Sequence, residues 1–177
     1  MWVVVNVLLR AFLVFAVTGG LLGCAGMDLP TLRANGERPL TASGALGHYD
    51  SARDASLRLV ISGLEEDSSG RPARAMANYQ RAIRVDPTNP FAFLALARHH
   101  LEGHSVAEAS AFLDQARSLF EAQQRLGPAV DVWGIGLRAG IDRALGRHDL
   151  ADSRFDQARQ LSPEIWGDER LSADELR

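Results

Sequence analysis

Two groups of residues in this sequence carry side chains that could do chemistry: a single cysteine and a small histidine cluster. Cys24 is the only cysteine among 177 residues, which excludes an internal disulfide, and it closes an apolar run that starts at Met1. A lone cysteine at the end of such a run is a small buried apolar residue, a reactive thiol or a point of covalent attachment to a membrane. The residues around it must decide among these three roles.

The histidine cluster is the segment HHLEGH at 99–104. His100 and His104 are four residues apart, a spacing that would place both on one face of a helix as metal ligands, with Glu102 nearby. However, Gly103 separates them at an expected helix end, and no glutamate directly follows the first histidine, as the zinc-protease motif requires. The pattern therefore favours a solvated turn at a helix C-terminus, where cations are stabilised, over a metal site.

The rest of the sequence contains few signs of catalysis. It has no phosphate-binding glycine loop, no nucleophile elbow and no second cysteine. Its formal net charge of −3 provides no basic surplus for a nucleic-acid backbone. The acidic run at 65–67 is typical of a solvated patch at a helix end. These features predict a protein that is not an enzyme, needs no cofactor and does not bind nucleic acid.

The apolar stretch over residues 1–23 is the segment that comes directly before Cys24. After Arg10 it continues for about a dozen mainly apolar residues, the length of a signal-peptide core and short of the roughly 20 residues that span a bilayer. The segment LLGC at 21–24 resembles the lipobox of bacterial lipoproteins. The resemblance implies a signal peptide over residues 1–23, cleavage before Cys24, and covalent lipid on that residue, with palmitate-type acyl chains as the membrane anchor.

The same resemblance suggests a location. Ala25, in place of an aspartate after the cysteine, implies export to the outer membrane of a bacterial cell envelope, facing the periplasm. The alternative is an uncleaved N-terminal helix that anchors the chain in the inner membrane and leaves Cys24 as a free thiol. Such a helix would bury Arg10 in the bilayer, which costs several kcal/mol on most scales.

The next segment, residues 24–50, has the composition of a tether. It mixes Gly, Pro, Ser, Thr and Asn with scattered apolar residues and shows no sustained period. We therefore expect a lipidated N-terminus followed by a flexible tether that lets a folded domain stand off the membrane. The end of this segment could instead be an ordered arm that docks on the domain through Leu46 and Tyr49.

The chain beyond residue 50 has the signals of helices. The segment 89–103 starts with Asn89 as a helix N-cap and Pro90 at the first helical position, and it ends in glycine. The next segment opens with Ser105 and Glu108 in the spacing of a capping box and ends at a Gly-Pro pair. These signals predict two adjacent helices joined by a tight turn.

Equivalent residues recur along these helices at a spacing of 34 residues. This interval separates Gly63 from Ala97, Ala75 from Ala109, Tyr79 from Leu113, and Ala82 from Ala116. A third copy follows the second at a spacing of 42 residues, which is 34 plus an insertion of 8. Counted from the second copy, this spacing leads to Ala139, Ala151, Phe155 and Ala158. Gly70, His104 and Gly146 share one position, at the expected turn of each copy.

This pattern resembles the tetratricopeptide repeat, a helix-turn-helix unit of about 34 residues. The resemblance implies an all-α fold, a short solenoid of about three repeats at about 56–89, 90–123 and 132–165 within a helical domain over residues 51–177. Small residues at the recurring positions would let helices approach one another, and the large apolar ones would fill the space between them. The alternative is an irregular helical bundle with accidental spacing.

The family resemblance also implies a binding surface, because the first helix of each repeat lines a concave groove that takes a partner peptide. Register gives a mostly apolar set of groove residues: Leu57, Val60, Leu64, Phe91, Leu94, Arg98, Trp133, Gly136, Gly140 and Arg143. The basic and amide residues with which one subfamily clamps a terminal carboxylate are missing. An amphipathic helix or an extended segment with apolar anchors is therefore the expected ligand, unless the N-terminal arm or a second copy covers the groove.

The C-terminal tail is expected to leave the last repeat uncovered. Ser172 and Glu175 have the spacing of a capping box, but too little chain follows for a solvating helix. A terminal face exposed near Trp166 would favour self-association or a protein partner.

The function predicted from all these features is that of a membrane-anchored periplasmic scaffold or assembly adaptor for an envelope complex. Family analogues are pilotins, outer-membrane assembly subunits and adaptors of cell-wall hydrolases, and the fold does not choose among them. The alternatives are an uncleaved inner-membrane scaffold and a metal-binding envelope enzyme that uses His100 and His104. Protein partners of the envelope are expected in either scaffold interpretation, with a homo-oligomer as a further option.

Overall fold

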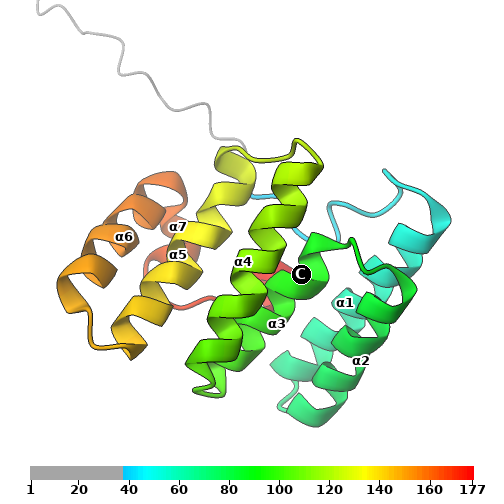
Figure 1. The fold of residues 1–177 in the computed structure, drawn as a ribbon, viewed down its shortest axis with the longest axis horizontal. Helices are drawn as coiled ribbons and strands as arrows, with labels where there is room; N and C mark the ends of the chain where they lie inside the picture. The colour runs from blue at the N-terminus through cyan, green and yellow to red at the C-terminus, as the bar shows by residue number, and fades with distance from the viewer. Residues whose placement is uncertain (1–37) are drawn as a thin grey trace, which may run out of the picture. The chain divides into compact units, whose positions relative to one another are not determined.

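A computed structural model describes residues 38–177 of the chain, and its secondary structure over this range is entirely α-helical (Figure 1). Six long helices form three consecutive hairpins, and two short helices follow them. The helices are α1 (Ser51–Ser68), α2 (Pro72–Val85), α3 (Pro90–Glu102), α4 (Val106–Ala122), α5 (Pro128–Ala144), α6 (His148–Leu161), α7 (Pro163–Trp166) and α8 (Ala173–Leu176). This arrangement confirms the predicted all-α repeat solenoid. Within the described residues, no helix is both long and apolar enough to cross a membrane.

The three hairpins turn in the same way. Gly70, His104 and Gly146 have φ angles of 69°, 59° and 75°, so each lies in the left-handed region directly after the first helix of its pair. The residue after each of them donates a backbone hydrogen bond to the carbonyl five positions back, at 2.8, 2.8 and 2.9 Å. This bond is typical of a Schellman-type helix end. The predicted equivalence of the three turn residues is confirmed, although His104 lacks the conformational freedom of glycine.

Close helix contacts in the first hairpin depend on a residue without a side chain. Gly63 of α1 faces Tyr79 of α2, and a Cβ atom built on the glycine would overlap the tyrosine ring. The alanines at the other recurring positions are all buried, and all except Ala151 belong to the same core cluster as Tyr79, Leu113 and Phe155. Small residues therefore permit the close approach of helices, and aromatic or aliphatic side chains fill the space beside them.

The insertion after the second repeat lengthens two helices. Both α4 and α5 contain 17 residues, whereas α2 has 14 and α3 has 13. The first turn of α5 binds the segment that precedes α1, because the Leu40 N–H donates a hydrogen bond to the Ala129 carbonyl at 2.8 Å. The insertion thus extends α4 at its C-terminal end and α5 at its N-terminal end, although α1, with 18 residues, is longer than either helix.

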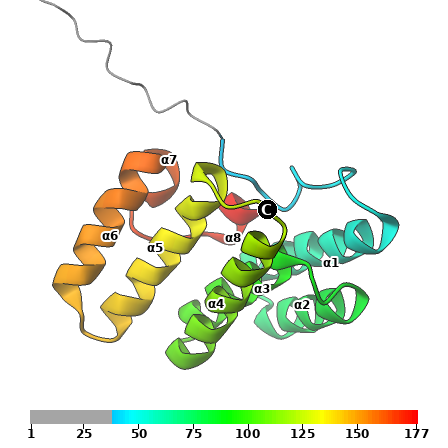
Figure 2. The same ribbon diagram turned by 45° about the horizontal axis from the view of Figure 1, so that its top comes forward.

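Segments from both ends of the described chain pack onto the array. After α7 the tail passes behind α5 and ends in α8, which lies beside α1 and α3 (Figure 2). Residues 38–50, expected to close a flexible tether, are instead an arm whose Ala42 and Ala45 are buried in the core. The alternative prediction of an ordered arm therefore holds for these residues. The fully buried side chains of the arm are the two alanines, whereas Leu46 and Tyr49, which were expected to dock, are only partly buried against the same core.

Candidate interaction site

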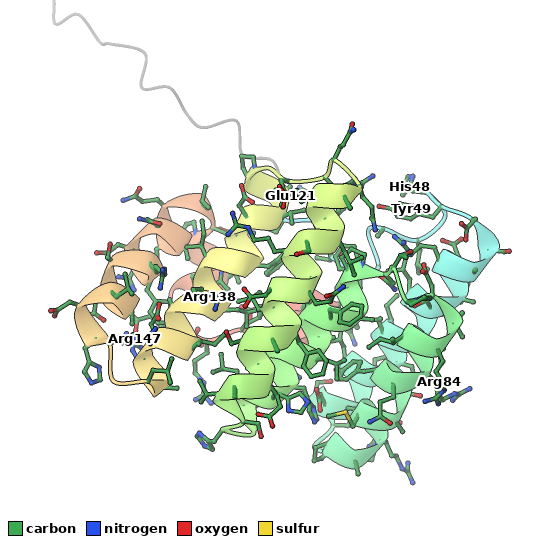
Figure 3. The ribbon with its side chains drawn as sticks, in the orientation of Figure 1. His48, Tyr49, Arg84, Glu121, Arg138 and Arg147 are labelled. Carbon is green, nitrogen blue, oxygen red and sulfur yellow. The ribbon has the colours of Figure 1, made fainter. Side chains whose placement is uncertain are left out.

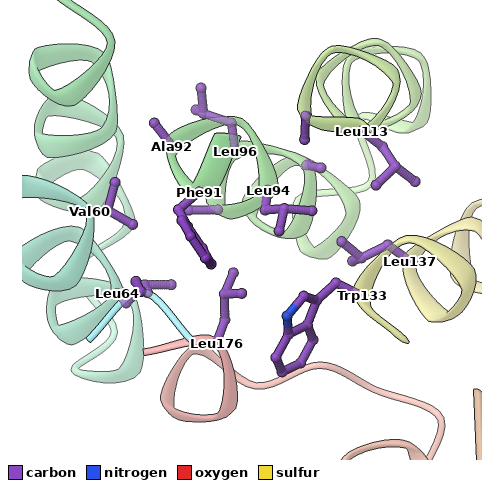
Figure 4. Close-up of a cluster of buried hydrophobic side chains, with 14 of the residues drawn as sticks. Val60, Leu64, Phe91, Ala92, Leu94, Leu96, Leu113, Trp133, Leu137 and Leu176 are labelled. Carbon is purple, nitrogen blue, oxygen red and sulfur yellow. The ribbon is translucent and has the colours of Figure 1, made fainter. Parts of the chain in front are cut away.

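The predicted groove residues lie in the core of the described structure rather than on an open surface. Seven of them have large side chains that are almost fully buried: Leu57, Val60, Leu64, Phe91, Leu94, Arg98 and Trp133. Figure 4 shows several of them around Leu176, whose side chain points into the space between Leu64, Phe91 and Trp133. The first helices of the repeats do line one common face, as register implied, but this face is filled.

The chain's own terminal segments fill this face. Leu176 of α8 has no exposed surface, and Ala42 and Ala45 of the arm are buried beside it. The two segments bind each other through their backbones, since the N–H groups of Ala42 and Ser43 donate to the last two carbonyls of the chain at 3.1 and 2.7 Å. Trp133 fixes the arm as well, because its indole Nε1 donates to the Leu40 carbonyl at 3.0 Å. A partner peptide therefore finds no open groove on this face.

The remaining groove candidates also serve internal packing. A Cβ on Gly136 would overlap the ring of Trp166, and one on Gly140 would lie 2.8 Å from the Leu101 side chain. Arg143 pairs with Asp152 and with Glu169 of the tail, and its guanidinium lies 4.5 Å from the centroid of the Phe155 ring. Gly136 and Arg143 therefore hold the tail to the third hairpin, whereas Gly140 lets α5 approach Leu101 of α3.

The expectation that Trp166 lies on an exposed terminal face is wrong. The side chain of Trp166 is buried between Gly136 of α5 and Phe155 of α6. The centroids of the Trp166 and Phe155 rings are 6.0 Å apart. The predicted capping box between Ser172 and Glu175 is present, and it starts α8 after the tail has passed the last hairpin. The tail therefore covers apolar surface of the array without a long helix. It does so with single buried side chains, those of Trp166 and Leu176.

The acidic run at 65–67 also differs from its expected role. Only Glu65 is well exposed, and the side chain of Asp67 is 5% exposed. The Tyr79 hydroxyl donates to Asp67 at 2.9 Å, His99 Nδ1 lies 3.0 Å from its other oxygen, and Arg98 forms an ion pair with it. Since a carboxylate only accepts hydrogen bonds, Nδ1 of His99 is the donor in this contact. Asp67 is the acceptor of a buried network that joins α1, α2 and α3.

The electrostatics of this network keep Asp67 ionised. Burial alone would raise the pKa of Asp67, but the hydrogen bond from His99 and the charge of Arg98 outweigh it and hold the pKa below its usual value. Burial and the Asp67 carboxylate raise the pKa of the Tyr79 phenol, which stays protonated. The network is therefore a structural ion pair with hydrogen-bonded partners, and it does not line the cleft described below.

The two histidines singled out by their spacing do not face a common ligand. The ring of His100 stacks on Phe112 with centroids 5.2 Å apart, and burial together with the neighbouring His99 lowers its pKa. His104 has the left-handed backbone of the turn instead of lying on the helix. Among residues 38–177, no group of three or more His, Cys, Asp and Glu side chains is placed to hold a metal ion.

The described structure has a different open feature, a cleft of about 350 Å³ between α4 and α5 that α6 borders. Its floor consists of apolar side chains that are at most 7% exposed, and its rim combines arginines with one acid and one exposed leucine. The floor residues are Leu94, Leu113, Phe120 and Val130, with Gly134 and Ile135 above them. The rim residues are Arg117, Leu126, Asp131, Arg138 and Arg154. None of these residues belongs to the arm or to α8.

Two features of the backbone create this cleft. A Cβ built on Gly134 would meet no atom within 4 Å, so this glycine leaves space on α5 that no neighbouring side chain fills. Leu126 lies in the loop after the lengthened α4 and is 42% exposed. Figure 3 shows Arg138 on α5 at the side that faces α4, where it donates to Ser110 at 2.9 Å and pairs with Asp114.

Comparison with protein families gives one match. Residues 68–126 match the family model described as tetratricopeptide repeat. The matched range begins at the end of α1 and contains all of α2, α3 and α4. This match supports the tetratricopeptide interpretation of the repeats and a role in binding other proteins. No match was found among curated proteins or among solved structures.

The alternative that the N-terminal arm covers the groove holds for the described residues, since Ala42 and Ala45 are buried there. Sequence reasoning missed the cleft, the Asp67 network and the place of α8 on the concave face. The apolar residues after Ser172, in a segment with a capping box, could have signalled α8 as an element that packs. The cleft had one signal in the sequence, the 8-residue insertion combined with glycine-rich α5. Cys24 and the segment before it lie outside the described residues, so their predicted roles stay predictions.

Proposed function

We propose that this chain is a lipid-anchored scaffold of the bacterial cell envelope, which binds other proteins through its helical repeats and has no catalytic role. The observation that carries the proposal is the array of three helical hairpins, of which residues 68–126 match the tetratricopeptide repeat. Repeats of this kind present extended surfaces to other proteins. The location in the envelope rests on the sequence LLGC at 21–24 and on the apolar run before it.

A lipid on Cys24 would give the scaffold a defined place of action. One acyl chain binds membranes only marginally, whereas the two or three chains of a lipoprotein anchor it stably. Residues 25–37 would then connect the anchor to the arm that packs on α5 and α8. Binding of partners would take place close to the membrane surface, on the periplasmic side of the outer membrane.

The anchor is tested by the mass of the mature N-terminus and by metabolic labelling with palmitate in a bacterial host. We expect a chain that starts at Cys24, carries lipid and loses both label and membrane association in Cys24→Ala. The matched control is His48→Ala in the exposed part of the arm, which should keep the label because it leaves the cysteine in place. An intact Met1 peptide without label would overturn the lipoprotein proposal in favour of an uncleaved inner-membrane anchor.

The scaffold role is tested by crosslinking in intact cells followed by identification of the captured proteins. We expect a reproducible set of envelope proteins to be captured by the wild-type chain and to be lost when the repeats unfold, for example in Gly63→Leu, where the added side chain would collide with Tyr79. Capture of the same set by the unfolded variant would show that the repeats do not mediate the interaction. Turnover of an envelope substrate by the purified chain would contradict a non-catalytic role.

A further inference from the structure

We infer that the outer face of the first hairpin binds the phosphate groups of anionic membrane lipids and lays this end of the array on the membrane surface. The face, here called the arginine face, consists of four exposed arginines of α1 and α2: Arg58, Arg74, Arg81 and Arg84. The inference rests on the membrane anchor that is part of the proposed function. It specifies which surface of the repeats the membrane occupies, and therefore which surfaces stay available to protein partners.

Helix register brings these arginines onto one side of the hairpin. The arginines of α2 follow one another at spacings of seven and three residues, which keeps them on one face of the helix. The two helices meet beside this face, where Asn78 donates to the Ser62 hydroxyl at 3.2 Å. Arg58 lies one turn before Ser62 on α1, and Arg81 lies one turn after Asn78 on α2, so both are on the same side of the pair. Figure 3 shows Arg84 at the free end of the array, directed away from the other hairpins.

The positive charge of this face is not neutralised by its neighbours. Helix α2 contains three arginines and no Asp or Glu, and none of the four arginines forms an ion pair with another residue of the range 38–177. On α1, Glu66 pairs with Arg71, and the charge of Arg74 also helps to lower the pKa of Glu66. One carboxylate therefore serves two guanidinium groups, and the surface keeps a positive surplus.

The other carboxylates of the hairpin bind groups away from the arginine face. Asp67 and Asp86 lie inside the structure, each in an ion pair with a buried arginine. Glu65 pairs with the C-terminal arginine, and Asp54 accepts a hydrogen bond from the Gly47 N–H at 3.1 Å. These acids are engaged elsewhere, so the arginine face is free to bind an external anion.

The two ends of the array differ in charge. Residues 128–177, which form the third hairpin and the tail, contain ten carboxylates against seven guanidinium groups. An anionic surface therefore attracts the first hairpin and repels the third. Val85, next to Arg84, is 43% exposed and adds an apolar group that the boundary between headgroups and acyl chains accommodates.

A membrane is favoured as the occupant because the proposed anchor holds the chain beside one. Residues 25–37 can extend to about 45 Å. Helix axes in contact lie about 8–10 Å apart, so α1, which α3 separates from α5, lies about 20 Å from the helix that binds Leu40. The tether is thus long enough for the first hairpin to reach the surface. Four arginines attract anionic lipid only modestly, but an anchored chain meets the headgroups at high local concentration.

The test compares how close the two ends of the array lie to a vesicle. The full chain is reconstituted through its own anchor into phosphatidylcholine vesicles with or without about 30% phosphatidylglycerol, and a rhodamine lipid serves as energy acceptor. The donor dye is attached at Ala77→Cys on α2 or at Ser153→Cys, the equivalent exposed position of α6 in the third repeat. A lipid on Cys24 leaves the introduced thiol as the only reactive one. If Cys24 is free, both labels are placed in the Cys24→Ala chain, which the uncleaved helix then anchors.

We expect energy transfer from Ala77→Cys to rise at least about twofold with phosphatidylglycerol and to fall back in about 0.5 M salt, because the attraction is electrostatic. Transfer from Ser153→Cys should not change. The double variant Arg81→Gln/Arg84→Gln should lose the rise, whereas Arg81→Lys/Arg84→Lys should keep it, because lysine retains the charge. Arg170→Gln, at an exposed arginine of the tail, is the matched control and should behave as the wild type.

Several outcomes would overturn the inference. Equal transfer from Ala77→Cys in both kinds of vesicle, an equal rise at Ser153→Cys, and a rise that persists in the glutamine variant each show that the arginines do not bind lipid. Equal transfer in both vesicles, combined with envelope proteins that only the glutamine variant fails to crosslink, would assign the face to an acidic protein instead.

Flotation with phosphatidylcholine vesicles reports the anchor alone. A chain that does not float contradicts the anchor and, with it, the inference. A chain that floats without the change in energy transfer contradicts the inference and leaves the proposed function intact.

Discussion

The indole ring of Trp166 lies against the backbone of Gly136, so closely that a Cβ atom on the glycine would overlap the ring. This contact joins the tail to α5 and starts the path by which α8 reaches the concave face. It also explains why one of the glycines of α5 has no side chain, whereas Gly134 of the same helix meets no neighbouring atom. The stability of the fold should therefore depend on which glycine of α5 is replaced.

The first prediction compares two glycines of the same helix. Gly136→Ala should lower the free energy of unfolding by about 1–3 kcal/mol, because the methyl group overlaps Trp166. Gly134→Ala should raise it by up to about 1 kcal/mol, because alanine favours helices and the added methyl meets no atom. Urea unfolding followed by circular dichroism measures both. Equal effects of the two substitutions would show that Trp166 does not pack on α5 in solution.

The second prediction concerns the anchor of the C-terminus. Leu176→Ala should cost about 2–5 kcal/mol of stability, since the side chain is fully buried among residues of α1, α3 and α5. Leu161→Ala, at an exposed position, should cost less than about 0.5 kcal/mol. Urea unfolding of the two variants gives the comparison. A small effect at Leu176 would mean that α8 leaves the concave face in solution and that the groove is open.

The third prediction concerns the strained turn of the second repeat. His104→Gly should stabilise the fold by about 1 kcal/mol, because His104 has a φ angle of 59° that glycine adopts without steric cost. Gly70→Ala should destabilise the equivalent turn of the first repeat by a similar amount. Thermal midpoints of the two variants should therefore shift in opposite directions. A loss of stability in His104→Gly would indicate an interaction of the imidazole that the described structure lacks.

The fourth prediction concerns acid stability. The pKa of Asp67 is lower in the folded protein than the value of about 3.9 for an unfolded chain. Its contribution to stability is therefore complete above about pH 3.9 and is lost as the pH falls from there through the folded pKa. Asp67→Asn should cost about 3 kcal/mol at pH 7, because it removes the buried partner of Arg98 and leaves only the exposed Glu102 to pair with it. The substitution should also flatten the loss of stability below about pH 4.

The control for this pH dependence is Glu65→Gln. Glu65 belongs to the same acidic run but is exposed, so its substitution should change neither the stability at pH 7 nor the slope in acid. Stability of both variants is measured by urea unfolding between about pH 2.5 and 7, a range chosen to bracket the carboxylate pKa values. An unchanged acid slope in Asp67→Asn would show that the network does not set the acid limit of the fold.

Local patterns in the sequence predicted much of the fold. The spacing of 34 residues, the caps at Asn89 and Ser172, and the three equivalent turn residues are local or periodic features, and the structure contains them. The capping box predicted at Ser105 and Glu108 is wrong, because α4 starts after Ser105 without a side-chain hydrogen bond from that residue. The interaction surface was predicted less well. Register located the common face of α1, α3 and α5, but it could not show that the side chain of Leu176 occupies it.

By itself the sequence determined the helices, their pairing into hairpins and the resemblance of residues 21–24 to a lipoprotein signal, because these depend on neighbouring residues and on a short repeat. Only the tertiary structure decided which apolar face stays open. The arm and α8 come from opposite ends of the described chain and meet on the concave face through backbone hydrogen bonds that any residues except proline could make. The cleft beside α4 remains open because no side chain of residues 38–177 fills the space that Gly134 leaves.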